Sequence, residues 1–173
     1  MLATAPGWIW DGETLPVPVE DIVDSCFGLL VRDMPDLTTA PGVPTLAPEQ
    51  SLSGLLLPAR GEIWVNAEEA RRWPQRRRFT IGHELGHWCL HSQQGPTVYC
   101  RSTAISEGQE KRRQRPAEED ANHFAAALLM PARLVQRHYE RLRRSDPDAC
   151  FVRLCEHFEA SGAAMGRRLR TVV

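Results

Sequence analysis

Two histidines and a glutamate occur at a spacing that suits a metal-dependent hydrolase. The segment His83-Glu84-Leu85-Gly86-His87 has the pattern H-E-x-x-H. On a helix, residues four positions apart lie on one face, so the imidazoles of His83 and His87 can bind one zinc ion. Glu84 would then lie beside the metal, where its carboxylate can act as a general base. The chemistry that this pattern predicts is hydrolysis by activated water.

The residues around the motif predict a buried helix. Composition alone would place H-E-x-x-H in roughly one such chain in sixty, so the pattern needs support from its context. Apolar residues precede the motif, at Phe79 and Ile81, and follow it, from Trp88 to Leu90. Two histidines and a glutamate buried without a metal would leave polar groups that are costly to satisfy. We therefore expect a metal site, with a solvated helical face as the alternative.

A catalytic zinc site needs a third protein ligand and keeps one position open for water. His91 continues the same helical face, but three ligands along one straight helix cannot all reach one ion well. The next predicted helix begins with the carboxylates Glu118, Glu119 and Asp120. Asn122 lies one turn after Glu118, where its side chain can hold the free ring nitrogen of a ligating histidine. The alternative explanation for these three carboxylates is that they only form the acidic first turn that many helices have.

The elements that must position these residues follow from apolar periodicity, proline and glycine. Two apolar runs, 52–57 and 62–66, flank Pro58-Ala59-Arg60-Gly61, which is typical of a β-hairpin. The second run could be an edge strand that pairs with an extended substrate, or an ordinary buried strand. Irregular segments are expected at 1–14 and 33–50, and a long surface loop at 92–117. Helices are predicted at 19–27, 75–91, 117–130, 132–144 and 147–160, with a short last helix from residue 161.

Length and pattern predict one α+β domain over residues 1–173, with helices around a small mixed or antiparallel sheet. The net charge of −1 gives no general reason to expect attraction to nucleic acid or to a membrane. Five cysteines with no C-x-x-C pair argue against a disulfide framework and against a cysteine zinc site. The N-terminal residues do not form a signal peptide, and no apolar run is long enough to span a bilayer. We therefore expect a cytoplasmic protein with reduced thiols.

Three segments in a fixed order carry a resemblance to a known family. They are Arg78-Phe79-Thr80-Ile81-Gly82-His83-Glu84-Leu85-Gly86-His87, then Glu118-x-x-Ala121-Asn122-x-Phe124-Ala125, then Leu128-Leu129-Met130-Pro131. Together they resemble the ImmA/IrrE family of metallopeptidases, and the resemblance covers most of the chain from about residue 15 to 170. The stretch between Cys100 and Glu118 is longer and more basic than the family pattern leads us to expect.

The resemblance implies a thermolysin-like zincin core in which the small sheet packs against the active-site helix and several C-terminal helices. It implies that His83, His87 and Glu118 bind zinc, with manganese as an alternative working metal. Glu84 is then catalytic, and Asn122 is the supporting residue four positions after the third ligand.

The resemblance also implies a narrow substrate. Relatives cleave a repressor of the helix-turn-helix type and thereby switch on stress-response or mobile-element genes. We expect such a regulator to be encoded nearby, with no membrane partner and no direct binding of nucleic acid. The sequence is also compatible with two other functions. One is the toxin component of a toxin–antitoxin pair, and the other is a module that binds a partner or DNA and keeps zinc as a structural element.

Overall fold

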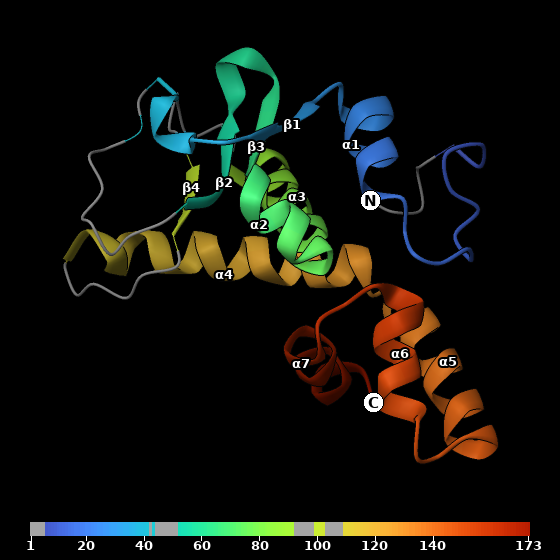
Figure 1. Cartoon of the computed structure of the whole chain (residues 1–173). Coiled ribbons are helices and arrows are strands. Elements are labelled where there is room, and N and C mark those ends of the chain that lie inside the picture. Colours follow the sequence, from blue (N-terminus) through green and yellow to red (C-terminus); the bar gives the residue numbers. More distant parts are fainter. Residues whose placement is uncertain (1–5, 42, 44–51, 92–98, 103–108) are drawn as a thin grey trace.

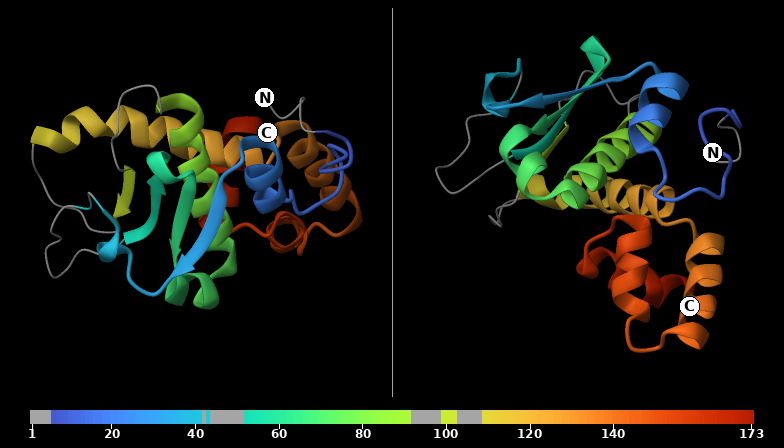
Figure 2. Two further views of the ribbon diagram at one scale, coloured as in Figure 1. Left: turned by 90° about the horizontal axis from the view of Figure 1, so that it is seen from above. Right: turned by 45° about the vertical axis from the view of Figure 1, so that its right-hand side comes forward.

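The computed structural model of the protein describes residues 6–41, 43, 52–91, 99–102 and 109–173, with side chains described outside 99–115. Within these ranges the fold is α+β: a small sheet packs on helix α3 (Pro74–His91), and α3 packs in turn on α4 (Gln109–Leu129) (Figure 1). The C-terminal helices form a cluster at the end of α4, and Figure 2 shows this cluster standing away from the sheet. None of the helices described is long and apolar enough to cross a membrane.

The sheet has four strands in the order β1-β3-β2-β4. β2 (Leu52–Leu57) and β3 (Glu62–Asn66) are antiparallel and form the predicted hairpin, which turns through a 3-10 helix at Pro58–Arg60. β1 (Leu30–Met34) pairs with β3 in parallel, and β4 (Tyr99–Ser102) pairs with β2 antiparallel, so the sheet is mixed. The sequence did not predict β1 or β4.

The suggestion that residues 63–66 form an edge strand is wrong. β3 lies between β1 and β2, so both of its edges are hydrogen-bonded within the sheet. β2 and β3 are also covered on both faces, which explains why they read as continuous apolar runs without alternation. On the face toward α3, Leu56, Ile63 and Val65 share a core with Ile81 and Leu85. A second core on the opposite face contains Leu37, Ala40, Leu52, Leu55, Leu57 and Trp64.

The described ranges contain seven α-helices, and the predicted ones are confirmed with small shifts of their ends. α2 was not expected. The others match the predicted ranges, except that α4 begins much earlier than residue 117. The remaining helices are α1 (Val19–Phe27), α2 (Ala67–Arg72), α5 (Ala132–Ser145), α6 (Cys150–Phe158) and α7 (Gly162–Val172).

The surface loop that the sequence predicts over 92–117 instead contains β4 and the first turns of α4. The sequence misses these turns because residues 109–115 have no apolar face and because Pro116 is typical of a helix start, whereas here it lies inside the helix. The predicted irregular segment 33–50 includes the end of β1 and a 3-10 turn at Leu37–Thr39. Residues 1–5, 42, 44–51, 92–98 and 103–108 lie outside the described part of the chain.

The crossing of α3 and α4 is set by glycines that face alanines. A Cβ atom on Gly86 would lie 3.0 Å from the Cα atom of Ala121, and one on Gly82 would lie 3.4 Å from the Cβ atom of Ala125. Without side chains at these two positions, the helix backbones approach more closely than larger residues allow. The close approach brings the first described side chains of α4 within reach of the histidines on α3.

Candidate metal centre

Two buried histidines of α3 form the base of the site. The side chains of His83 and His87 are 0% and 1% exposed, respectively. One turn apart, they point their Nε2 atoms at each other at 3.1 Å, with the rings edge to face. The i to i+4 spacing of the sequence motif therefore produces the predicted pair of converging imidazoles.

The carboxylate of Glu118 reaches this pair from α4. Its Oε2 atom lies 3.2 Å from His83 Nε2, and its Oε1 atom lies 3.2 Å from His87 Nε2. Burial by itself raises the pKa of Glu118, but hydrogen bonds and charge interactions with the two histidines outweigh burial and hold that pKa at about 2. Glu118 is thus an anion at any physiological pH, which is the state that binds a metal cation.

The three side chains fit a zinc ion. Their ligand atoms all lie within 4.8 Å of one another, and the measured separations are 3.1–3.2 Å. Tetrahedral zinc with bonds of about 2.0–2.1 Å places its ligands about 3.4 Å apart, close to the separations seen here. Two imidazole nitrogens and one carboxylate oxygen are also a donor set that zinc prefers. Glu118 is 36% exposed, so the cluster is open to solvent on the α4 side.

Asn122 and His91 lie behind the two histidines. Asn122 Oδ1 is 3.2 Å from His83 Nδ1, where it can accept the Nδ1 proton and leave Nε2 free to bind a metal. His91 was considered as a third ligand from the sequence, but its Nδ1 atom instead lies 3.4 Å from Nδ1 of His87. Its Nε2 atom is 3.9 Å from a carboxylate oxygen of Asp120. The sequence analysis missed this placement, although the i+4 spacing of the two histidines was a signal for it.

The alternative carboxylates lie outside the ligand cluster. Within the described residues, Asp120 lies near His91, at the 3.9 Å distance given above, and not at the histidine pair. Glu119 is exposed and lines a groove between α4 and α7 that includes none of the three clustered side chains. Among the three acids that the sequence left open, Glu118 is therefore the one that the fold brings to the histidine pair.

Glu84 is fully buried between α3 and β2. Gly54 makes this possible, because a Cβ atom there would lie 2.2 Å from Thr80 Cγ2 and 3.1 Å from Glu84 Oε1. Any other residue at position 54 would push the strand away from the helix or displace the glutamate. The sequence analysis also missed Gly54, whose signal was a glycine inside an apolar strand, a pattern typical of close backbone approach.

Arginines fix the N-terminal half of α3. Arg77 donates from Nε to Asp33 Oδ1 of β1 at 2.9 Å and from an amino group to Glu20 Oε2 of α1 at 3.1 Å. The hydrogen bonds that Arg77 donates to the carboxylate of Glu20 raise the pKa of Arg77 above its usual range. Arg78 donates to the backbone carbonyl of Val17 at 2.6 Å. These contacts tie α3 to α1, to β1 and to the segment before α1, so the histidines project from a fixed helix.

A family model described as the IrrE N-terminal-like domain, of the M78 peptidases, matches residues 28–170. The matched range contains all four strands, the ligand cluster and the glutamate between the two histidines. No curated protein matches the chain.

Proposed function

This chain belongs to the M78 peptidase family, and on that premise we propose that it is a zinc-dependent endopeptidase with narrow specificity. The observation that carries the proposal is the cluster of His83, His87 and Glu118, whose ligand atoms lie within 4.8 Å of one another. Membership of the family supports a metallopeptidase, and therefore a protein substrate.

In this proposal Nε2 of His83, Nε2 of His87 and a carboxylate oxygen of Glu118 hold the metal, with manganese as the alternative to zinc. Asn122 holds His83 in the tautomer that leaves Nε2 unprotonated, as the 3.2 Å contact with Nδ1 supports. When bound, zinc supplies Lewis acidity that activates water near neutral pH and polarises a peptide carbonyl.

Glu84 acts as the general base and then as the general acid. Its carboxylate accepts a proton from the attacking water and passes it to the amide nitrogen of the substrate, so that the C–N bond breaks and a neutral amine leaves. Its burial against β2 at Gly54 supports this role, because a carboxylate held between two packed elements keeps one position relative to the histidines.

We place the substrate among transcriptional repressors of the helix-turn-helix type, encoded near this gene and cleaved in the cytoplasm to switch on stress-response or mobile-element genes. The resemblance to the ImmA/IrrE family supports this part of the proposal. The odd number of cysteines, with no C-x-x-C pair among them, supports a reducing compartment.

The test is cleavage of a co-expressed neighbouring regulator by the zinc-loaded protein, followed by mass spectrometry of the products. Glu84→Gln should abolish cleavage while zinc content stays unchanged, and Glu156→Gln, on the exposed face of α6, should cleave like the wild type. Cleavage that persists in Glu84→Gln would overturn the proposal. Growth arrest caused by Glu84→Gln would instead indicate a toxin, and binding of the regulator without any cleavage would indicate a binding module.

A further inference from the structure

A groove runs between α4 and α7 beside the metal centre. Its volume is about 800 Å³, and Phe79 of α3 is one of its lining residues. A second cavity of about 440 Å³ adjoins it and extends toward Trp73. The two cavities share four lining residues, which are Phe79, Met130, Ala164 and Arg167. The two cavities therefore lie side by side along the junction between the α3–α4 pair and the C-terminal helices.

The groove lies next to His83, on the side of its ring that carries Nδ1. Asn122 lines the groove and also contacts His83 through its amide oxygen. Glu119, the residue after the third ligand Glu118, lines it as well, and Phe79 lies one helical turn before His83. The groove is therefore separate from the ligand cluster but close to it, with Asn122 as the residue that lines the groove and also contacts a clustered histidine.

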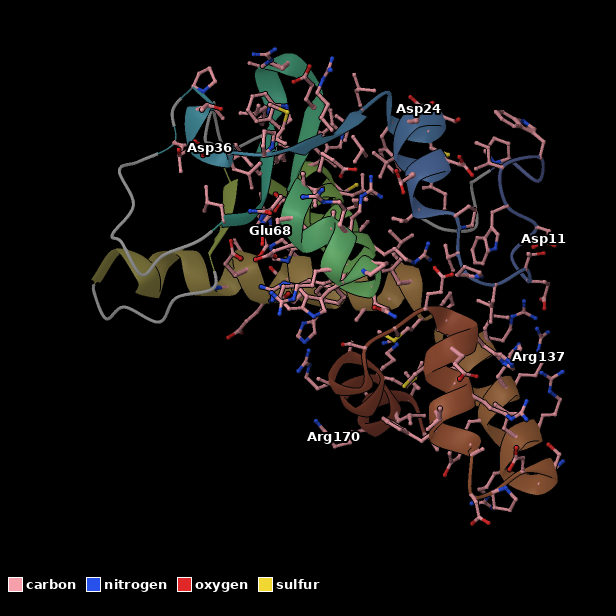
Figure 3. All side chains as sticks on the ribbon, viewed as in Figure 1. Asp11, Asp24, Asp36, Glu68, Arg137 and Arg170 are labelled. Carbon is pink, nitrogen blue, oxygen red and sulfur yellow. The ribbon has the colours of Figure 1, made fainter. Side chains whose placement is uncertain are left out.

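The groove has an apolar floor and a basic wall. Ala126 and Ala127 of α4 and Met130, just after the end of α4, form part of the floor, and three arginines of α7 form the wall. Those arginines are Arg167, Arg168 and Arg170, and Figure 3 shows Arg170 projecting from α7.

None of the three arginines forms an ion pair with a carboxylate in the described part of the chain. On α5, by contrast, Arg133 and Arg137 both pair with Glu13. Arg168 is half-buried, donates to the backbone carbonyl of Met130 at 2.8 Å, and has a pKa lowered by burial. A partly desolvated guanidinium without an anion is a site where a bound carboxylate stabilises the charge.

We propose that this groove between α4 and α7 binds an acidic, partly apolar segment of the substrate polypeptide, at a distance from the bond that is cleaved. The inference rests on the proposed peptidase function and adds a determinant of its narrow specificity. The arginine wall pairs with glutamate or aspartate of that segment, and the floor takes its apolar side chains. A polypeptide fits better than nucleic acid, because the floor is apolar and because the carboxylate of Glu119 repels phosphate at the end nearest the metal centre.

The experiment measures the binding of labelled peptides to the full chain by fluorescence anisotropy, with a chelator present so that neither metal nor hydrolysis contributes. One peptide alternates glutamate with leucine, and its partner has glutamine in place of every glutamate. The variants are Arg167→Glu with Arg170→Glu, and Ala127→Trp, which narrows the groove without changing charge. The matched control is Arg143→Glu with Arg144→Glu, an equal charge change on the exposed face of α5.

The glutamate peptide should bind at least about tenfold more tightly than the glutamine peptide. Both groove variants should lose this binding by a similar factor, and the α5 control should keep it. Equal binding by the wild type and the Arg167→Glu, Arg170→Glu variant, or the absence of any binding, would overturn the proposal. Tighter binding of a labelled DNA duplex that is lost in the same variant would also overturn it. Because the chelator removes the metal, these outcomes do not depend on whether the protein cleaves anything.

Discussion

Asn122 Oδ1 lies 3.2 Å from Nδ1 of His83, on the side of the ring opposite the ligand cluster. The contact fixes both the orientation and the tautomer of the imidazole. Asn122→Ala should therefore weaken zinc binding by about 10–100-fold, the range found for residues that support metal-binding histidines. Competition with a chromophoric chelator measures the affinity. His123→Ala, an exposed neighbour on α4, is the control and should bind zinc like the wild type. Unchanged affinity in Asn122→Ala would show that packing alone orients His83.

Glu118 and Glu119 are adjacent carboxylates with different placements, so they make a matched pair for testing the metal site. Only Glu118 lies within 3.2 Å of both histidines. Glu118→Ala should lose bound zinc in elemental analysis after dialysis, and Glu119→Ala should retain about one equivalent. Zinc retained by Glu118→Ala would mean that another group completes the site.

Gly86 and Gly82 form a second matched pair, at the crossing of α3 and α4. A methyl group on Gly86 would meet the backbone of Ala121 at 3.0 Å, which cannot yield without moving α4. Overpacking of this kind costs about 1–3 kcal/mol, against a gain in helix propensity of about 1 kcal/mol. Gly86→Ala should therefore lower the free energy of unfolding and weaken zinc binding as well.

Gly82→Ala places its methyl group at an ordinary contact distance, 3.4 Å from Ala125 Cβ. This substitution should be neutral or slightly stabilising, because no steric clash of the added methyl group offsets the gain in helix propensity. Denaturant unfolding measures the free energy of unfolding of both variants. Equal stability of Gly86→Ala and Gly82→Ala would contradict the close contact between position 86 and the backbone of Ala121.

Burial raises the pKa of the Cys89 thiol to about 11. Since the thiolate is the reactive form, Cys89 should resist alkylation by iodoacetamide at pH 7, whereas the exposed Cys26 should react first. As the pH rises toward 11 the Cys89 thiolate becomes populated, and its alkylation rate should increase about tenfold per pH unit up to that point. Peptide mass spectrometry after timed labelling measures both sites. Modification of Cys89 at the rate of Cys26 near pH 7 would contradict the burial.

The parts of the fold that the sequence predicted are those governed by local spacing. The histidine pair and the shared face of Glu118 and Asn122 follow from the four-residue spacing of a helix, and the hairpin follows from two apolar runs that flank a Pro/Gly turn. β1 and the early start of α4 could not be predicted in this way. β1 is short and has mostly exposed side chains, and its place depends on pairing with β3, about thirty residues later.

In the candidate site, too, local spacing predicted some features and only tertiary packing determines the others. Spacing indicated Glu118 as one of three acids, but only the packing of α4 on Gly82 and Gly86 distinguishes it from its two neighbours. The groove was also invisible in the sequence, because α7 reaches α4 only through the tertiary fold, by way of Arg168 and the carbonyl of Met130.

Helix α4 carries Glu118 and Asn122 toward the histidines and Ala126 and Ala127 along the groove. Because one rigid helix holds both sets, a bound segment that displaces α4 also changes the distance between Glu118 and its two histidines. The free energies of the two binding events are then linked, and the linkage has the same size in both directions. A ligand in the groove that tightens metal binding tenfold must itself bind tenfold more tightly to the metal-loaded protein.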